Sequence, residues 1–343
     1  MSELVNRLAN LTAIRDRDAL DMALVSAISD LLQPETCAIY RVVGEVGNEH
    51  WLTSAQLAQG QLTPTFDAAW SSLDLLPNLN DHPLRQKSVE TQTVQHSEGE
   101  PSVAVFPIAT GVEGASVLEV RTAGQMSSDS LRLVTGVLRL YLNFLSLLDY
   151  GERDSLTELL NRKTFDTAFL KASNEQRLAA EVPLGERRAT ETSGSYWLVM
   201  IDIDHFKKVN DNYGHLIGDE VLLLLARLMR THFRFHDQLY RFGGEEFVVL
   251  MRCNGEAEAF NVLERLRVTT EAHRFPQVGT ITISVGFSEV MAGDTPSGAF
   301  ERADQAVYYA KGHGRNQVCS YAALIAQGEL AQHAENIGDM ELF

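Results

Sequence analysis

Residues 240–250 read Tyr-Arg-Phe-Gly-Gly-Glu-Glu-Phe-Val-Val-Leu, so two glycines and two glutamates lie between two apolar runs. Glycine reaches positive φ without steric cost, which makes Gly243-Gly244 a turn dipeptide between two strand-like segments. We therefore expect a β-hairpin with Glu245 and Glu246 at its tip. Adjacent carboxylates repel each other unless a cation lies between them or one of them is protonated. The stretch therefore predicts a divalent-metal site at a hairpin turn.

A second acidic pair follows an apolar run further upstream. Residues 196–201 read Tyr-Trp-Leu-Val-Met-Ile, and Asp202 and Asp204 come next, on either side of Ile203. A continuous apolar run is typical of a strand buried on both faces, and side chains two residues apart on a strand share a face. If this strand lies beside the hairpin, Asp202 and Glu245 can meet and bind Mg²⁺ through oxygen ligands. The alternative is two unrelated acidic turns.

Further blocks of sequence occur in a fixed order around these two stretches. They are Asp-Ser-Leu-Thr-Glu-Leu-Leu-Asn-Arg at 154–162, Asp-Ile-Asp-His-Phe-Lys-Lys-Val-Asn-Asp at 202–211, Tyr-Gly-His at 213–215, Gly-Asp-Glu at 218–220, Ser-Val-Gly at 284–286, Ala-Asp at 303–304 and Lys-Gly-His-Gly-Arg-Asn at 311–316. With the hairpin stretch, these blocks resemble the diguanylate cyclases, a family named for its Gly-Gly-Asp/Glu-Glu-Phe signature. The resemblance covers about residues 154–320. Glu245, where many members carry aspartate, is an accepted variant that keeps an oxygen ligand.

The resemblance implies an enzyme that condenses two GTP molecules into cyclic di-GMP and releases two pyrophosphates. It implies that Asp202 and Glu245 are side-chain metal ligands and that the carbonyl of Ile203 is a third ligand. Mg²⁺ is the expected cofactor, with Mn²⁺ as an alternative. Glu246 is expected to take the proton from the ribose 3′-hydroxyl, although its placement also suits a second metal ion. A solvated hairpin tip is the alternative for the whole motif.

The phosphates of the nucleotide are expected at two places. A helix that starts near Asp204 would offer free N–H groups to a triphosphate, at Phe206 and Lys207. Lys311 and Arg315 would supply cations to the β- and γ-phosphates; without the family context they would be an ordinary basic loop. The bare backbone of Gly243 and Gly244 leaves room for a ligand at the hairpin.

Base recognition is expected from Asn210 and Asp219. The carboxylate of Asp219 can accept from the N1–H and the exocyclic amine of guanine, two donors that adenine does not offer in that arrangement. Asp219 therefore favours GTP over ATP. Each residue has an alternative role: Asp219 could cap a helix that begins at Glu220, and Asn210 could end the preceding helix.

A third motif, Arg234-Phe235-His236-Asp237, precedes the hairpin at the family spacing for an inhibitory site that binds the product. Arg265 falls where the family has a further arginine that contacts the product. Guanidinium groups suit both a phosphate and the Hoogsteen edge of guanine. The alternative is a surface ion pair between Arg234 and Asp237 on a helix end. The resemblance also leaves a second function open, namely a catalytically weak receptor for cyclic di-GMP.

Composition limits the other functions of the chain. It has 343 residues, of which 45% are hydrophobic, and a formal net charge of −17, which disfavours binding to nucleic-acid polymers. Three cysteines without paired spacing, at positions 37, 253 and 319, indicate a reducing compartment. No segment was expected to be long and apolar enough for membrane insertion, and the N-terminus lacks a secretory pattern. We therefore expect a cytoplasmic protein.

The chain is expected to be α/β (α+β) with four segments. Residues 1–130, with a helical stretch at 20–32 and strand-like runs at 37–43, 103–108 and 115–120, resemble a GAF sensor domain with an antiparallel sheet and helices; a PAS-like sensor is the alternative. Residues 131–153 are expected to be a signalling helix. Residues 154–322 would be the palm-like GGDEF domain, with a central sheet flanked by helices, and residues 323–343 an acidic tail.

Each domain is expected to hold one GTP, so the two reacting nucleotides must come from two domains that face each other. The cyclase is therefore expected to act as a homodimer. In the linker, the apolar residues Val134, Leu138, Tyr141, Leu145 and Leu148 alternate four and three apart, which is typical of the seam of a parallel coiled coil. The alternative is a helix that packs on its own sensor domain.

Overall fold

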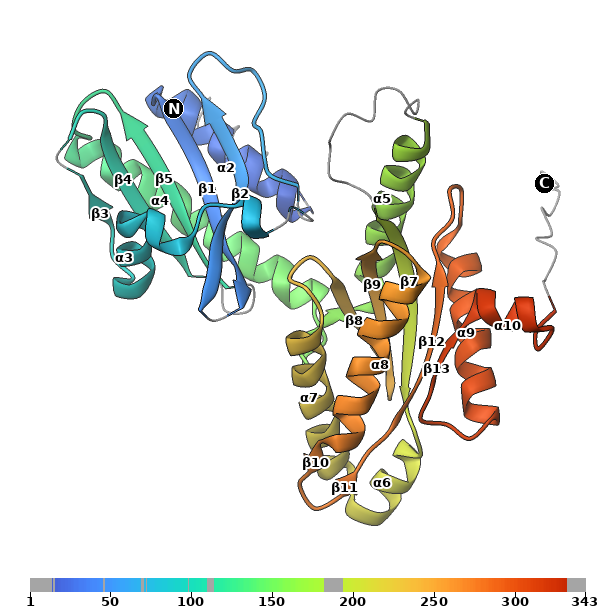
Figure 1. Ribbon diagram of the computed structural model, residues 1–343. Coiled ribbons are helices and arrows are strands. Elements are labelled where there is room, and N and C mark those ends of the chain that lie inside the picture. Colours follow the sequence, from blue (N-terminus) through green and yellow to red (C-terminus); the bar gives the residue numbers. More distant parts are fainter. Residues whose placement is uncertain are drawn as a thin grey trace, which may run out of the picture. The chain divides into compact units, whose positions relative to one another are not determined.

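The protein is described here by a computed structural model, which covers residue 14 and residues 16–45, 47–68, 71, 73–97, 99–109, 114–181 and 194–331. The chain divides into two compact units, Met1–Arg153 and Asp154–Phe343. Each unit has its own sheet and its own hydrophobic core (Figure 1). The mixed α/β class predicted from the sequence is confirmed.

The N-terminal unit contains an antiparallel sheet in the order β2-β1-β5-β4-β3. Its strands are β1 (Thr36–Glu45), β2 (Asn48–Ala58), β3 (Gln95–His96), β4 (Ser102–Ala109) and β5 (Ala115–Thr122). Its helices are α2 (Arg17–Leu32), α3 (Pro83–Thr91) and α4 (Ser128–Glu152), with short 3₁₀ turns at η1 (Leu73–Leu75) and η2 (Leu79–Asp81). The predicted helix at 20–32 and the three predicted strands are confirmed, whereas β2 and α3 were not predicted.

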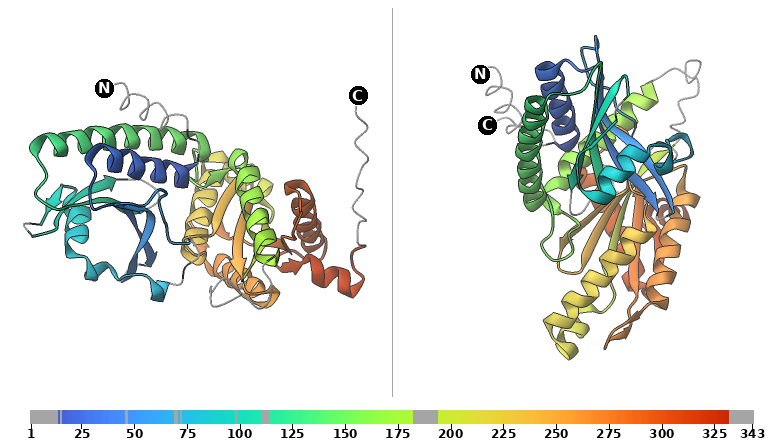
Figure 2. Two further views of the ribbon diagram at one scale, coloured as in Figure 1. Left: turned by 90° about the horizontal axis from the view of Figure 1, so that it is seen from above. Right: turned by 90° about the vertical axis from the view of Figure 1, so that its left-hand side faces the viewer.

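Side chains alternate between the two faces of this sheet, and different helices pack on each face. On one face, residues such as Phe106 and Leu118 pack against α2 and α4, which run side by side (Figure 2). On the other face, Trp51, Val105 and Val117 pack against apolar residues of α3 and η2. The sheet is therefore buried on both faces, with two helices on one of them.

Helix α4 contains the five residues of the predicted coiled-coil seam. All five, from Val134 to Leu148, are at most 7% exposed and belong to the core that α4 shares with α2 and the sheet. The structure therefore has the alternative arrangement, a helix packed on its own domain. Among the residues that the structure describes, α4 is long and apolar enough to cross a membrane by length and composition. The prediction that no segment has this character was wrong for α4, and its apolar residues are explained in part by this core.

The C-terminal unit contains a mixed six-stranded sheet in the order β13-β12-β7-β9-β8-β6. Its strands are β6 (Leu160–Asn161), β7 (Ser195–Ile203), β8 (Gln238–Gly243), β9 (Glu246–Cys253), β12 (Ile283–Glu289) and β13 (Val318–Ser320), and β10 (Arg274–Phe275) and β11 (Gly279–Thr280) form a separate pair. Its helices are α5 (Arg162–Glu181), α6 (Phe206–Tyr213), α7 (His215–His232), α8 (Glu256–Ala272), α9 (Pro296–Gly312) and α10 (Tyr321–Gln327).

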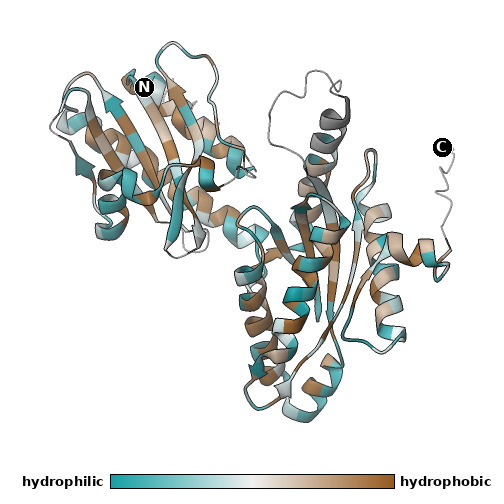
Figure 3. Ribbon diagram, in the orientation of Figure 1, coloured by the Kyte–Doolittle hydropathy of each residue, from teal (hydrophilic) through white to brown (hydrophobic). Residues whose placement is uncertain are grey.

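Helices cover both faces of this sheet, as predicted for the domain. Side chains of α7 and α8 pack on one face, and those of α5 and α9 pack on the other. Figure 3 shows the apolar residues gathered along the central strands and on the inner sides of these helices. Along β7, Ile201 and Ile203 face the α7 and α8 side, whereas Met200 faces the α5 and α9 side. By strand alternation, Asp202 and Asp204 therefore share the face that α9 covers.

Helix α9 comes unusually close to the sheet at Gly286 on β12. A Cβ at this position would overlap the backbone of Ala303 and Val307, so only glycine allows the approach. This contact holds α9 against the sheet and directs its C-terminal end, with Lys311, toward the end of β7. Helix α10 also packs into this unit, since Leu324 is buried, so a tail would begin beyond Gln327. The boundaries of the four predicted segments otherwise stay a prediction.

Candidate active site

The hairpin at residues 240–250 is present as predicted. Strands β8 and β9 pair antiparallel, with Gly243 opposite Glu246 and Gly244 and Glu245 forming the turn. Gly244 has φ +52°, a conformation that favours glycine. The guanidinium of Arg241 donates to the carbonyl oxygen of Gly244 at 2.9 and 3.2 Å. The same guanidinium donates to Asp154 Oδ1 at 3.0 Å, so the turn is tied to the first residue of the unit.

The two predicted acidic stretches meet across neighbouring strands. Asp202, near the end of β7, is directly opposite Glu246, the first residue of β9. Directly opposite residues of an antiparallel pair project from the same face, with Cβ atoms about 5 Å apart. Lys311 Nζ lies 2.6 Å from Asp202 Oδ2. The interpretation as two unrelated acidic turns is therefore wrong. Of the two opposite carboxylates, Asp202 is in contact with a cation, Lys311 of α9.

The electrostatics of this group are those of carboxylates short of positive charge. Burial raises the pKa of Asp202; Lys311 lowers it, but Glu246 and Asp204 raise it again, and it stays above its usual value. Burial also raises the pKa of Glu245, with Asp202 adding to the shift and Lys311 opposing it. A divalent cation would favour the charged forms of both groups. The ends of β7 and β9 therefore form a site that favours an additional cation.

The donor set fits Mg²⁺, which takes few protein carboxylates and completes its shell with water and phosphate oxygens. Among the described residues, no three His, Cys, Asp or Glu side chains are grouped as metal ligands. The predicted set does not need such a group, because it consists of Asp202, Glu245 and the carbonyl of Ile203, the last residue of β7. The metal-ligand roles stay a prediction.

The two residues expected to read the base lie on neighbouring helices. Asn210 lies inside α6, whose C-cap is Gly214, so it does not end that helix. Asp219 is the fifth residue of α7 and is exposed, so it does not cap the helix. Gly218 lies so close to the Asn210 side chain that a Cβ there would overlap it. The alternative roles of Asp219 as a helix cap and of Asn210 as a helix end are therefore wrong. Because Gly218 has no side chain, Asn210 lies against α7 directly before Asp219.

The predicted phosphate contacts are distributed over two segments. Helix α6 begins at Phe206, two residues later than expected, and its N-cap residue His205 makes no side-chain capping bond. The Phe206 ring is buried in the core, so its backbone N–H is the group left for a phosphate, whereas Lys207 is exposed. Arg315 is exposed in the loop after α9. Lys311 and Arg315 therefore belong to one segment, but Lys311 also pairs with Asp202.

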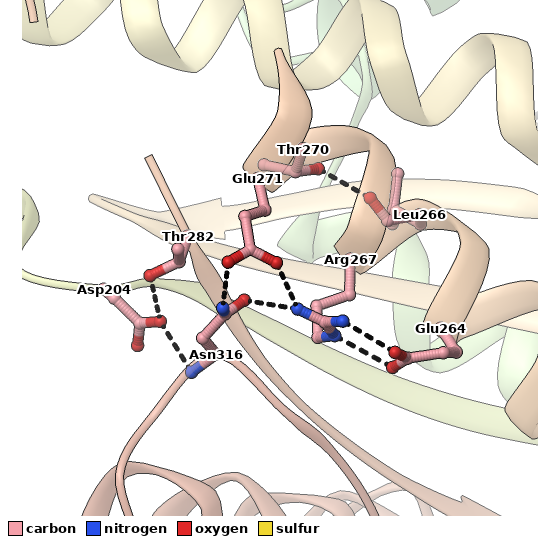
Figure 4. A network of polar contacts seen from close by, with 8 residues as sticks. All are labelled: Asp204, Glu264, Leu266, Arg267, Thr270, Glu271, Thr282 and Asn316. Atoms are coloured by element: carbon pink, nitrogen blue, oxygen red, sulfur yellow. Dashed lines mark hydrogen bonds and ion pairs between the residues drawn. The ribbon is translucent and has the colours of Figure 1, made fainter. Parts of the chain in front are cut away.

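The other acidic residue at the end of β7 has a different role, which the sequence did not indicate. Asp204 is 5% exposed and accepts hydrogen bonds from the hydroxyls of Thr282 and Ser284, both at 2.7 Å. It also accepts from the backbone N–H of Asn316 at 3.0 Å (Figure 4). Asp204 therefore holds the loop after α9. Three donors at an acid next to a basic loop could be found from the sequence only if the pairing of β7 with β12 were known.

The predicted product site lies at the turn between α7 and β8. The Asp237 side chain is 5% exposed and accepts from the backbone N–H groups of Arg234 at 2.8 Å and Arg252 at 3.3 Å. Burial raises the pKa of Asp237 to about 6. The Arg234 side chain, 56% exposed, donates to Glu258 at 2.9 Å. The proposed surface ion pair is therefore not what the structure has, because Asp237 shapes the turn and Glu258 pairs with Arg234.

Arg265 lies near this turn, on helix α8. Its guanidinium donates to the carbonyl oxygen of His232, the last residue of α7, at 3.0 Å. Arg234 and Arg265 are thus held by neighbouring acceptors at one end of the α7 and α8 layer. Binding of the product by Arg234, Asp237 and Arg265 stays a prediction.

Comparison with known proteins agrees with this geometry. Residues 152–317 match the family described as "Diguanylate cyclase, GGDEF domain". The diguanylate cyclase DgcP of Pseudomonas aeruginosa is 40% identical over 168 residues, which cover 48% of this chain and 23% of DgcP. The response regulator PleD of Caulobacter vibrioides is 39% identical over 156 residues, which cover 44% of this chain and 34% of PleD. The chain thus spans about a quarter to a third of these relatives.

Two solved structures are also similar in sequence. The GGDEF domain of DgcB from Caulobacter crescentus, in complex with c-di-GMP, is 31% identical, with a TM-score of 0.45, over 50% of this chain and 96% of that one. The active GGEEF domain of a diguanylate cyclase from Vibrio cholerae is 33% identical, with a TM-score of 0.41, over 48% of this chain and 97% of that one. The similarity to the GGDEF family thus extends over residues 152–317.

Proposed function

We propose that the protein is a diguanylate cyclase, which joins two GTP molecules into cyclic di-GMP and releases two pyrophosphates. The observation that carries the proposal is the group formed by Asp202, Glu246 and Lys311, in which an acidic pair and a cation converge at the ends of β7 and β9. A protein that only bound cyclic di-GMP at Arg234 would have no need of this group. The named relatives support the same activity.

Glu246 is the exposed member of the acidic pair and is free to accept the proton of a ribose 3′-hydroxyl. Asp202, Glu245 and the carbonyl of Ile203 would hold Mg²⁺, or Mn²⁺, which when bound polarises the α-phosphate and lowers the pKa of the attacking hydroxyl. Lys311, together with Arg315, offsets the charge of the leaving pyrophosphate. The backbone N–H groups at Phe206 and Lys207 bind the triphosphate at the start of α6.

Guanine specificity is assigned to Asn210 and Asp219. Their positions on α6 and α7, next to Gly218, support a shared base site. An exposed carboxylate at Asp219 can accept two hydrogen bonds from guanine and would repel the acceptor N1 of adenine. GTP is therefore the expected substrate.

The reaction needs two active sites that face each other, and the exposed side of α4 is a suitable surface for a homodimer. Leu133, Leu140 and Leu147 repeat every seven residues, and Leu140, Leu147 and Tyr150 are 49%, 68% and 90% exposed. This stripe is distinct from the seam predicted from the sequence, which is buried in the monomer. Two copies of α4 that pack along it would form a two-helix contact of the coiled-coil type.

The N-terminal unit is proposed to be a GAF-like sensor that controls this dimer, with a PAS-like sensor as the alternative. Product inhibition is assigned to Arg234, Asp237 and Arg265. A cytoplasmic location is supported by Cys37, Cys253 and Cys319, which are all buried and unpaired, as expected in a reducing compartment.

Incubation of the full chain with GTP and Mg²⁺, followed by product identification, tests the proposal. Cyclic di-GMP and pyrophosphate in a ratio of about one to two are expected from the stoichiometry, and Glu246→Gln is the negative control. Binding of cyclic di-GMP without any pyrophosphate release at micromolar protein, where a dimer is detected by light scattering, would instead favour the receptor.

A further inference from the structure

The loop that follows α9 has a backbone that its own sequence does not favour. Arg315 and Asn316 have φ +65° and +45°, so two consecutive residues that are not glycine are left-handed. Such residues persist where surrounding contacts hold them. Lys311 and Arg315 flank or belong to this loop. What holds the loop therefore also holds the two cations that are assigned to the phosphates.

The contacts that hold the loop converge on Asn316 (Figure 4). Its backbone N–H donates to Asp204 Oδ2 at 3.0 Å. Its side-chain oxygen accepts from Arg267 at 2.8 Å, and its side-chain N–H donates to Glu271 Oε1 at 2.9 Å. Asn316 thus uses one backbone and two side-chain groups to join the end of β7, helix α8 and the loop after α9. We call Asp204, Glu264, Arg267, Glu271 and Asn316 the Asn316 network.

Arg267 is itself held firmly in this network. Two of its nitrogens donate to Glu264 at 2.7 and 2.9 Å, and a third donates to Glu271 at 2.8 Å. The hydrogen bonds that Arg267 donates to Glu264, which outweigh the opposing effect of burial, and to Glu271 raise the pKa of Arg267. Its side chain is 13% exposed, although it extends from a surface helix. Because the N–H groups of this guanidinium already donate to Glu264, Glu271 and Asn316, it is suited to orient Asn316 rather than to bind a ligand.

We propose that Arg267 and Asn316 are positioning residues that fix the loop after α9 so that Lys311 and Arg315 face the phosphates of the nucleotide. The inference rests on the proposed function. Neither residue touches Lys311 or Arg315 by a side-chain bond, so both act through the backbone of the loop. Cations held in place before the substrate arrives bind a triphosphate without the entropy loss of ordering the loop.

Two variants separate this role from a general effect on folding. Asn316→Gly removes the side-chain bonds but keeps the backbone N–H to Asp204, and glycine accepts φ +45° without strain. Arg267→Met removes the bonds to Asn316 but keeps an unbranched side chain on α8. The matched control is Arg302→Met on α9, because the Arg302 side chain is 14% exposed, close to the 13% of Arg267, and loses an ion pair with Asp294, which precedes that helix.

Calorimetry of the full chain with GMP and with a GTP analogue whose α–β bridge cannot be cleaved provides the measurement. The ratio of the two affinities reports only on the groups that bind the β- and γ-phosphates. We expect Asn316→Gly and Arg267→Met to lower this ratio by about 10-fold, the value of one hydrogen bond to a charged group. The affinity for GMP should stay within twofold, and Arg302→Met should leave the ratio unchanged.

Two outcomes would contradict the proposal, and a third would contradict the proposed function on which it rests. An unchanged ratio in folded Asn316→Gly shows that the loop needs no such anchor. An equal loss of affinity for both nucleotides, shared by Arg302→Met, assigns the network to stability alone. A wild-type protein that binds the GTP analogue no more tightly than GMP removes the phosphate role of Lys311 and Arg315, and thereby contradicts the proposed function itself rather than the network.

Discussion

Glu246 faces Asp202 directly across the β7–β9 pair, so its removal should change stability and activity in opposite directions. Like charges directly opposite on neighbouring strands destabilise a sheet by about 0.2–1 kcal/mol. Glu246→Gln keeps the shape and removes this repulsion, so the metal-free protein should become more stable by that amount. For a unit of this size, the expected rise in the melting temperature is about 0.5–4 °C.

Turnover should fall by at least ~10²-fold in the same variant, because the group that we propose as the acceptor of the ribose proton is lost. The assays are thermal unfolding in EDTA and pyrophosphate release from GTP with Mg²⁺. Glu301→Gln, an exposed charge removal on α9, is the control and should change neither measurement. Turnover within twofold of the wild type, or a lower melting temperature in EDTA, would refute the reasoning.

Added Mg²⁺ distinguishes the two roles left open for Glu246. A ligand that binds the folded state stabilises it in proportion to RT ln(1 + [L]/Kd). If Glu246 only accepts a proton, the wild type and Glu246→Gln should gain the same stability from Mg²⁺. If it also holds a metal ion, the variant should gain less.

Four further substitutions test the base site, the product site and the pH dependence. Asp219→Asn should reduce the preference for GTP over ATP by roughly 10-fold, measured as the ratio of kcat/KM values, and an unchanged ratio would remove Asp219 from the base site. Arg234→Ala should weaken cyclic di-GMP binding by roughly 10- to 100-fold in calorimetry without lowering the initial rate. Glu258→Gln removes the ion-pair partner of Arg234 and should strengthen this binding. Unchanged affinity in both variants would mean that Arg234 does not bind the product. Burial lowers the pKa of His236 from 6.5 to about 4, so this imidazole contributes a loss of stability as the pH drops between these values, whereas the carboxyl of Asp237, whose pKa burial raises to about 6, contributes in the opposite direction. His236→Gln should remove up to ~3 kcal/mol of that loss, and an identical pH profile of unfolding would contradict it.

The sequence predicted the hairpin, the buried strand and the meeting of their acidic ends, because strong local signals fix each of them. Gly243-Gly244 fits one kind of turn, and the apolar run before Asp202 fits a central strand. The approach of Lys311 to Asp202 was not predicted. It depends on the contact between α9 and β12 at Gly286, and β12 lies far from β7 in the sequence. Such long-range contacts have no signature in local periodicity.

Two interpretations were wrong for related physical reasons: the coiled-coil seam on α4, and the ion pair between Arg234 and Asp237 in the motif at residues 234–237. Along α4, two apolar stripes lie on the same helix, and heptad spacing alone does not tell which one faces the core. The stripe with Val134 and Leu148 packs in the core of the N-terminal unit, so Leu140 and Leu147 are exposed. At the motif, Asp237 satisfies backbone N–H groups of its own turn, a local competitor that the spacing from Arg234 does not reveal.

Asp202, on β7, and Asp204, in the turn directly after it, show how two identical side chains acquire different roles from their surroundings. Asp204 is saturated by two hydroxyls and one backbone N–H, so it has little left to offer a ligand and serves as an anchor. Asp202 has one cationic partner and an opposing carboxylate, and burial keeps its pKa raised. Asp202 is therefore the carboxylate that we propose as a metal ligand, whereas Asp204 holds the loop after α9.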